Sequence, residues 1–272
     1  MHDFIVELAR LGAGLAREHF APMIRHQVRE KSVHDYVSQV DGLVETALVE
    51  RIRQRFPGHR ILGEEGGPSG GSDDAWWIID PIDGTTNFIH GIPHFAVSIA
   101  FCDRQGIQTG VVLDVMRDEL FLAARGQGLS VNGRRVTTSG CGQLAQALVA
   151  TALAFRFPVA HDDVMAVFAA VQRSCDDHRR GGSASLDLAW VASGRLDAYY
   201  ELGIYPWDIA AGLLLVQEGG GVTSDYQGRD DHLLEQRSVV AGATPALHRE
   251  LLSQVAPLVP WLTRPPFAQD PG

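Results

Sequence analysis

The chain has 272 residues, 45% of them hydrophobic and 21% charged, which is typical of a globular protein and excludes a disordered or fibrous one. Its net charge of −10 argues against direct binding to nucleic acid or to an anionic membrane, because both partners require basic surface. Three widely spaced cysteines disfavour a disulfide framework and a thiolate metal site. The N-terminal stretch lacks the basic flank of a signal peptide, and we therefore expect a cytoplasmic protein.

Two amphipathic helices are predicted first. Apolar residues recur at helical spacing from Phe4 to Phe20. The same pattern predicts a second helix with Asp41 as its N-cap, ended by Pro57 and Gly58. A short strand in "HRILGEEGG" then leads into a glycine-rich loop.

Strands dominate the next part of the chain. The run "AWWIID" predicts a buried strand that ends at Asp80. The runs "HFAVSIAFC", "IQTGVVLDV" and "ELFLAARG" predict an antiparallel meander, and "VNGRRV" predicts a hairpin at Asn132 and Gly133.

Helices and strands alternate in the second half of the chain, which predicts stacked layers of sheets and helices. The segment "CDDHRR" is interpreted as an exposed helix end in which Arg179 has a structural role. We predict strands in "ALVATALAF", "LDAYYELG", "GVTSDY" and "RSVVAG", and helices in "HDDVMAVFAAVQRSC", "SLDLAWVASG", "WDIAAGLLLVQEGGG" (opened by Asp208) and from Pro245 to Leu252.

Carboxylates stand at the predicted ends of several elements, where functional sites collect. Pro81 disfavours a helix at Asp80, so Asp80 and Asp83 can point into one concavity. Carboxylates about 4 Å apart repel one another unless they are protonated or bridged by a cation. An all-oxygen set suits Mg²⁺, with Mn²⁺ as a substitute. The carboxylates are Asp41, Glu64, Asp80, Asp83 and Asp208.

The residues after "DPID" extend this pattern. Gly84, Thr85 and Thr86 fall where a helix N-terminus would offer backbone N–H groups to an anion. Carboxylates for a metal beside amides for a phosphate indicate phosphoryl chemistry. Each carboxylate taken singly is also explained as a helix cap or a turn residue, so the hypothesis depends on the joint pattern.

Taken together, the motifs resemble the inositol monophosphatase family of Mg²⁺-dependent, lithium-sensitive sugar phosphatases. The stretches "KSVHDYVSQVD", "ILGEEGG", "WIIDPIDGTTNFIHGIPHFAVSIA", "RRGGSASLDLAWVASGRLDAYYELG" and "PWDIAAGLLLVQEGGG" occur in the family's order. The resemblance implies an α/β fold with αβαβα layers, one domain over residues 1–262, and a homodimer. Its metal motifs would lie in residues 1–140, its substrate pocket in residues 141–262, and a proline-rich tail in residues 263–272.

The resemblance also assigns metal ligands. Glu64, Asp80 and the backbone carbonyl of Ile82 match the ligands of a first Mg²⁺. Asp80, Asp83 and Asp208 match those of a second, and Glu64 would serve a third, weaker ion.

Catalytic and substrate roles follow in the same way. Asp41 and Thr85 match the pair that orients and deprotonates the attacking water, and Glu64 would join them in catalysis. Glu201 matches a glutamate that accepts hydrogen bonds from ring hydroxyls. The substrate-binding residues implied are Asp83, Gly84, Thr85, Gly182, Ser183, Ala184, Glu201 and Asp208.

The implied reaction is Mg²⁺-dependent hydrolysis of myo-inositol monophosphate, a small phosphorylated polyol, with no nucleic acid or membrane partner. Related phosphatases of histidinol phosphate, fructose 1,6-bisphosphate or a 3′-phosphoadenosine nucleotide stay open as alternatives, and so does an additional transcription-regulatory role. One departure concerns Gly66, which stands where the family commonly has serine and which predicts a looser loop.

Overall fold

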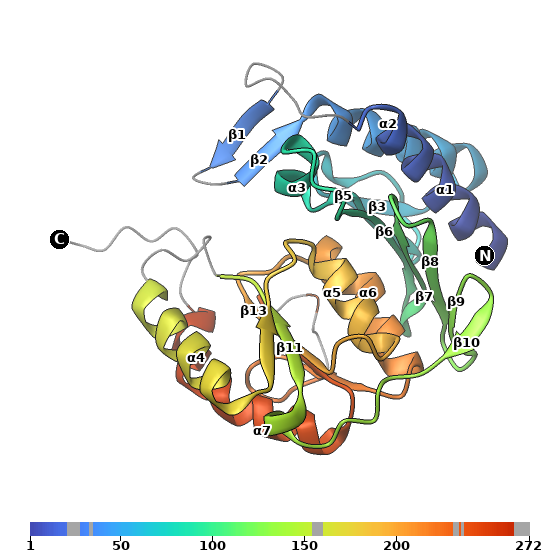
Figure 1. The fold of residues 1–272 in the computed structure, drawn as a ribbon. Coiled ribbons are helices and arrows are strands. Elements are labelled where there is room, and N and C mark those ends of the chain that lie inside the picture. Colours follow the sequence, from blue (N-terminus) through green and yellow to red (C-terminus); the bar gives the residue numbers. More distant parts are fainter. Residues whose placement is uncertain (21–27, 33–34, 154–159, 231–233, 235–236, 264–272) are drawn as a thin grey trace.

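The computed structural model describes residues 1–20, 28–32, 35–153, 160–230, 234 and 237–263 (Figure 1). The tail predicted for residues 263–272 lies outside this range except for Thr263, and so do the last two residues of the strand predicted in "ALVATALAF". Across the described ranges, no helix combines the length and the apolar character needed to span a bilayer.

The elements follow the order that the sequence predicts, with additions noted below. The helices are α1 (His2–Glu18), α2 (Gln39–Arg55), α3 (Thr85–Ile89), α4 (His161–Ser174), α5 (Ala184–Ala192), α6 (Pro206–Glu218) and α7 (Pro245–Val255), with 3₁₀ turns η2 (Leu144–Gln146) and η4 (Ala256–Thr263). The strands are β1 (Val28–Ser32), β2 (Asp35–Ser38), β3 (Arg60–Gly63), β4 (Gly67–Ser69), β5 (Trp76–Asp83), β6 (Ala96–Asp103), β7 (Gly106–Asp114), β8 (Glu119–Ala124), β9 (Gly128–Val131), β10 (Arg134–Val136), β11 (Leu148–Thr151), β12 (Asp177–Arg179), β13 (Ala198–Leu202), β14 (Val222–Ser224) and β15 (Ser238–Gly242).

Five layers stack in the order helix, sheet, helix, sheet, helix (Figure 1). Helices α1 and α2 cover one face of an eight-stranded sheet, and their apolar stripes form one core with it. Helices α5 and α6 lie between that sheet and a five-stranded sheet. Helices α4 and α7 cover the outer face of the five-stranded sheet and close a third core. The αβαβα arrangement is therefore confirmed.

The eight-stranded sheet brings distant carboxylates to one edge. Its order is β10-β9-β8-β7-β6-β5-β3-β4, and the meander predicted over β6, β7 and β8 is confirmed as antiparallel. Strands β5 and β9 extend it with antiparallel pairs to β6 and β8. Strands β3 and β5 are parallel, with Gly63 opposite Ile79. Because parallel strands end at the same edge, Glu64 after β3 lies beside the end of β5. The hairpin between β9 and β10 is also confirmed, with positive φ at Asn132 and Gly133.

Two helix starts differ from the predictions. Helix α2 begins at Gln39, so Asp41 is a buried residue of its first turn and not its N-cap. Helix α6 begins at Pro206, whose fixed φ suits the first helical position. Asp208 is the third residue of α6, and its carboxylate accepts the N–H of Tyr205 at 2.8 Å. The residues around both aspartates indicated the start of a helix, but they did not show which residue takes the N-cap position.

Short strands were missed. The β1–β2 hairpin before α2 and strand β4 were not predicted. The interpretation of "CDDHRR" as a helix end is wrong, because α4 ends at Ser174 and residues 177–179 form β12, parallel to β11. Arg179 is exposed and pairs with Asp177. A three-residue, charged edge strand has no hydrophobic period to reveal it.

Burial of His248 on α7 is expected to make the stability of the fold depend on pH. Its Nε2 lies 2.8 Å from Ser224 Oγ in a buried contact, and burial lowers the pKa of His248, followed in effect by the charge of Arg249. The folded state thus binds fewer protons than the unfolded state below the ordinary histidine pKa, and the stability that His248 contributes is lost as pH falls.

We expect His248→Gln, which keeps a hydrogen-bonding nitrogen but cannot titrate, to reduce the loss of melting temperature between pH 7 and pH 5. Thermal unfolding of both proteins across that range measures the difference. Parallel curves for the two proteins would show that His248 does not titrate in this window.

Candidate functional site

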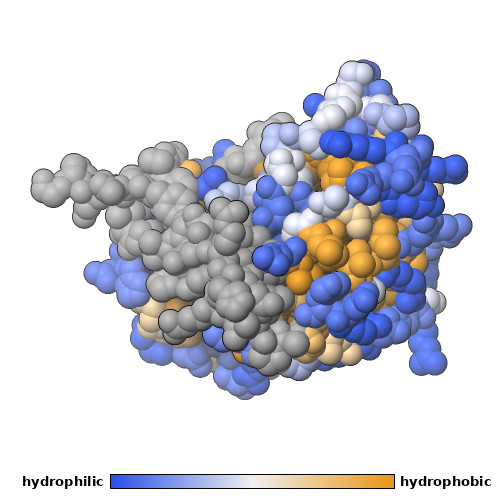
Figure 2. Space-filling view, turned by 90° about the horizontal axis from the view of Figure 1, so that it is seen from above, coloured by the Kyte–Doolittle hydropathy of each residue, from blue (hydrophilic) through white to orange (hydrophobic). Residues whose placement is uncertain are grey.

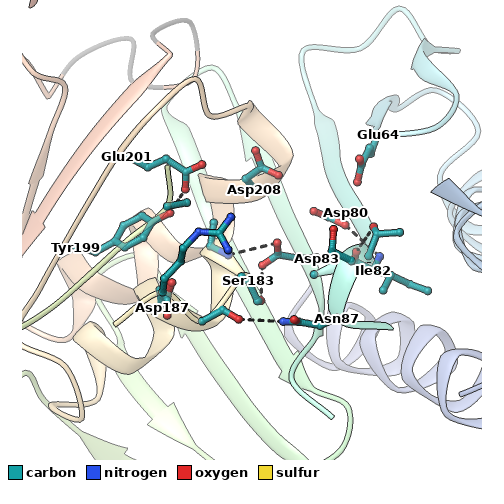
Figure 3. Close-up of a pocket in the computed structure, with 18 residues that line it drawn as sticks. Glu64, Asp80, Ile82, Asp83, Asn87, Ser183, Asp187, Tyr199, Glu201 and Asp208 are labelled. Atoms are coloured by element: carbon teal, nitrogen blue, oxygen red, sulfur yellow. Dashed lines mark hydrogen bonds between the residues drawn. The ribbon is translucent and has the colours of Figure 1, made fainter. Parts of the chain in front are cut away.

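A single cavity of about 200 Å³ collects most of the site residues predicted from the sequence. Figure 3 shows Glu64, Asp80 and Ile82 on one side and Glu201, Tyr199 and Asp187 on the other, with Asp83 and Asp208 between them. The predicted residues that line it are Glu64, Asp80, Ile82, Asp83, Gly84, Thr85, Gly182, Ser183, Ala184, Glu201 and Asp208. The cavity therefore joins the predicted metal motifs to the predicted substrate residues.

The end of β5 positions two of the carboxylates. The apolar residues of β5 are buried in the sheet, and the strand continues past the predicted end at Asp80 to Asp83, with a register shift against β6 between the two. The N–H of Ile82 donates to Asp80 Oδ1 at 3.0 Å, which fixes the turn of the backbone around Pro81. Asp80 and Asp83 are 1% and 7% exposed.

Asp80, Asp83 and Asp208 each offer a carboxylate oxygen, and these oxygens lie within 4.8 Å of one another. Burial raises the pKa of Asp80 well above its ordinary value, and the charges of Glu64, Asp83, Asp208 and Asp41 raise it further, in that order. Three buried carboxylates this close repel one another without a cation. The donor set consists only of oxygens and fits a hard divalent cation such as Mg²⁺.

Asp41 and Thr85 are brought together as predicted. Thr85 Oγ1 lies 3.1 Å from both Asp41 Oδ1 and the carbonyl oxygen of Ile82, and it can donate to either. Thr85 lines the cavity, whereas Asp41 on α2 is 0% exposed and lies behind it. Asp41 can therefore act on a group in the cavity through the Thr85 hydroxyl.

Gly84 turns the chain from β5 into α3. Its φ is 101°, a conformation that suits glycine, and an added Cβ would lie 3.1 Å from the carbonyl oxygen of His94 and 3.2 Å from that of Gly182. The turn thus passes close to the loop before α5. At the start of α3 the backbone N–H groups have no acceptor within the helix.

The start of α5 holds Asp83, one hundred residues away along the chain. Ser183 Oγ donates to Asp83 Oδ2 at 2.6 Å, and the N–H and Oγ of Ser185 donate to the same oxygen at 2.7 and 2.5 Å. The N–H of Ala184 lies 3.3 Å from Asp83 Oδ1. The predicted substrate segment thus also orients a predicted metal ligand, which sequence reasoning missed together with Ser185.

Asn87 makes a second link across the cavity floor. It is 8% exposed, and its Nδ2 donates to the carbonyl oxygens of His94 at 2.7 Å and Gly181 at 2.9 Å. Sequence reasoning did not single it out, although the motif "GTTNF" contains it.

Besides Asn87, three residues with polar or charged side chains that line the cavity were missed, namely Arg180, Asp187 and Tyr199. Asp187 and Tyr199 are buried, and Tyr199 donates its hydroxyl proton to Glu201. Burial, followed by the charges of Asp83 and Glu201, raises the pKa of Asp187. Arg180 contributes a positive charge to a cavity that the carboxylates otherwise make acidic. The quoted "RRGGSASLD" contains Arg180 and Asp187, but a linear motif does not show which side chains face a cavity.

Glu45 on α2 holds the loop that carries Glu64. It is 5% exposed, and its carboxylate accepts the N–H groups of Glu65 at 2.8 Å and Gly66 at 2.6 Å. A Cβ on Gly66 would lie 2.9 Å from Glu45 Oε1. The N–H of Gly66 is bound by Glu45, and the lack of a side chain on Gly66 makes room for that carboxylate, so the looser loop stays a prediction.

We expect Glu45→Ala to lower the free energy of unfolding by about 1–3 kcal/mol, because two partly buried hydrogen bonds to a buried, charged acceptor are lost. We also expect a higher Mg²⁺ concentration for half-maximal activity, since Glu64 loses its support. Chemical denaturation and Mg²⁺ titration measure the two effects. An exposed glutamate of the same helix, Glu50, provides the control variant Glu50→Ala. Equal Mg²⁺ requirements in both variants would contradict the proposed support.

Known proteins are similar to this chain in sequence and in fold. The model of the inositol monophosphatase family matches residues 1–259. "Nus factor SuhB" of Pseudomonas aeruginosa is 46% identical over 238 residues, which cover 86% of this chain and 87% of that protein.

Two solved structures are similar along almost their whole length. The extragenic suppressor protein SuhB of Bartonella henselae is 34% identical, with a TM-score of 0.88 over 93% of this chain and 97% of that one. Inositol monophosphatase of Anabaena (Nostoc) sp. PCC 7120 is also 34% identical, with a TM-score of 0.83 over 93% and 94%. Sequence motifs, layered fold and acidic cavity agree, and the chain belongs to the inositol monophosphatase family.

Proposed function

We propose that this chain is a Mg²⁺-dependent phosphomonoesterase that hydrolyses myo-inositol monophosphate to inositol and phosphate. The observation that carries the proposal is that the triad of Asp80, Asp83 and Asp208 lines one cavity together with Glu201 and with Thr85, behind which Asp41 lies. Glu64, Asp80, Asp83, Asp208 and the carbonyl of Ile82 would hold two or three Mg²⁺ ions, or Mn²⁺ in their place. Bound Mg²⁺ lowers the pKa of a water and stabilises charge on phosphate oxygens.

Other residues of the chain would transfer the proton and bind the phosphate. Thr85 Oγ1 accepts a proton from the attacking water as it passes its own proton to Asp41 Oδ1, with which it forms a hydrogen bond. Burial of Asp41 keeps this path away from bulk water. The N–H groups of Gly84 and Thr85 at the start of α3 bind the phosphate and orient it for in-line attack.

The alcohol of the substrate lies toward the second half of the chain in this proposal. Gly182, Ser183 and Ala184 form the wall against the sugar, and Glu201 accepts a hydrogen bond from a ring hydroxyl. Asp83, held by Ser183 and Ser185, connects the metal side of the cavity to this wall.

The test is a comparison of kcat/KM across candidate esters: inositol 1-phosphate, histidinol phosphate, fructose 1,6-bisphosphate and a 3′-phosphoadenosine nucleotide. We expect inositol 1-phosphate to be preferred, and we expect EDTA to abolish hydrolysis and added Mg²⁺ to restore it. Activity that survives the chelator sinks the metal mechanism, whereas preference for another ester changes only the substrate.

A second candidate function is participation in a transcription complex, in addition to catalysis. It is supported by the similarity to "Nus factor SuhB" of Pseudomonas aeruginosa. The net charge of −10 favours a protein partner over direct contact with RNA. Pull-down of purified RNA polymerase with the catalytically inactive Asp80→Asn variant tests this role separately from catalysis.

We also propose a cytoplasmic homodimer, as the family resemblance implies. Size-exclusion chromatography with light scattering measures the assembly state, and a mass of one chain at micromolar concentration would contradict it. Lithium inhibition is expected from the same resemblance and is measured in the Mg²⁺-dependent assay.

A further inference from the structure

Asp187 is a buried carboxyl group that the metal and water-activating assignments leave unused. It is 3% exposed, lines the cavity and lies beside Tyr199 on the side away from Glu64 (Figure 3). The face seen in Figure 2 carries a patch of apolar side chains, but nothing there indicates what would cover it. The carboxyl group of Asp187, in contrast, belongs to the wall of a defined cavity.

No hydrogen bond to the Asp187 carboxylate is made by any residue that the structure describes, in contrast to Asp83, which has Ser183 and Ser185 as donors. Burial of a carboxyl group without a partner is costly, and such groups are normally bound by protein, water or ligand. A Cβ on Gly181 would lie 3.0 Å from Asp187 Oδ1 and 2.8 Å from His94 Nε2, so the glycine leaves room beside both atoms. The carboxyl group is thus held at the cavity wall with its binding capacity unused.

We propose that Asp187 is a specificity-determining residue that hydrogen-bonds a hydroxyl group of the substrate alcohol, next to the hydroxyl bound by Glu201. The inference rests on the proposed function and deepens it. Asp187 and Glu201 both line the cavity, and Glu201 is 5% exposed and accepts a hydrogen bond from the fully buried Tyr199. The carboxyl groups of Asp187 and Glu201 therefore form one polar wall. A wall of two carboxyl groups selects an alcohol with at least two hydroxyls on one face of its ring.

The alternative role for Asp187 is structural, because it lies in the first turn of α5, where a negative charge stabilises a helix. Removing that charge would lower the melting temperature and affect all substrates alike. Loss of a hydroxyl contact would instead affect only esters that carry the hydroxyl.

The test compares myo-inositol 1-phosphate with cyclohexyl phosphate, which has the same six-membered ring without the hydroxyls. For each protein we take the ratio of kcat/KM for the inositol ester to kcat/KM for the cyclohexyl ester. We expect Asp187→Ala to lower this ratio by about tenfold. We expect Asp187→Asn, which can still bond a hydroxyl, to lower it by about two- to threefold. Asp162→Asn, which removes an exposed first-turn charge from α4, should leave it unchanged.

The outcomes separate the inference from the proposed function. If the wild-type protein hydrolyses neither ester with Mg²⁺, both are overturned. If it hydrolyses both with a ratio near one, or if the ratio is the same in the wild type and the Asp187 variants, the inference alone is overturned. Should Asp187→Ala fail to fold, the intermediate loss in Asp187→Asn supports the inference, and an unchanged ratio in that variant overturns it.

Discussion

Replacing Asp80 with Asn is expected to lower kcat/KM at least about a thousandfold while the protein still folds. Asp80 belongs to the triad whose oxygens lie within 4.8 Å, and the family resemblance makes it a ligand shared by two Mg²⁺ ions. Removing a shared ligand weakens both ions, and metal-stabilised charge is worth several kcal/mol, with each 1.4 kcal/mol equal to about a factor of ten in rate. Steady-state kinetics with Mg²⁺ measure this loss directly.

The thermal stability of the Asp80→Asn variant tests the metal assignment independently of activity. Burial and four neighbouring carboxylates raise the pKa of Asp80, so its charged form disfavours the metal-free fold at neutral pH. We therefore expect the metal-free variant to melt no lower than the metal-free wild type, and to gain less from added Mg²⁺. Calorimetric titration of Mg²⁺ and thermal unfolding measure the two effects.

Asp225→Asn is the matched control for Asp80→Asn. Asp225 is equally buried, and its carboxylate accepts the N–H groups of Gln227 and Arg229 outside the cavity. This variant should lose stability and keep its activity while folded. An Asp80→Asn variant that retains most of its kcat would show that the metal assignment is wrong.

The second large effect is expected at Asp41, which acts through Thr85. Asp41→Asn removes the proton acceptor behind the Thr85 hydroxyl, and general-base catalysis is typically worth a factor of about 10²–10⁴. We expect a loss of that size in kcat with little change in KM, because Asp41 does not line the cavity. Pre-steady-state kinetics at saturating Mg²⁺ separate this chemical step from substrate binding.

A double-mutant cycle tests whether Asp41 and Thr85 act as one unit. Thr85→Ala should cost about as much as Asp41→Asn, and the double variant should cost little more than either, since both remove one proton path. Thr85→Ser, which keeps the hydroxyl, should retain most of the activity. Fully additive losses would show that the two residues act separately.

The local half of the site could be predicted from the sequence. In "WWIIDPIDGTTNF", a buried run, a proline and a glycine follow one another closely, so the buried strand, the turn and the start of α3 follow from nearest-neighbour sterics, although β5 ends at Asp83 and not at Asp80. The hairpin at Asn132 and Gly133 was predictable for the same reason. In each case the structure depends on residues only a few positions apart.

Residues whose role depends on distant partners could not be found in this way. In the sequence, Glu45 looks like an ordinary polar residue of a helix. In the structure its carboxylate accepts the N–H groups of Glu65 and Gly66, which follow it by 20 and 21 residues. Residues 177–179 form strand β12 because their backbone pairs with that of β11. Neither hydrophobic period nor turn chemistry carries that information.

By itself, the sequence determined the helices and strands with strong periodicity, the layered fold class and the acidic motifs that identify the family. Only the tertiary structure decided that Ser183 and Ser185 hold Asp83, that Asp41 lies behind Thr85, and that Asp187 faces the cavity. The physical reason is the distance along the chain over which each kind of interaction acts. Steric and capping preferences act over a few residues, whereas hydrogen bonds and carboxylate repulsion depend on distances that packing of whole sheets and helices sets.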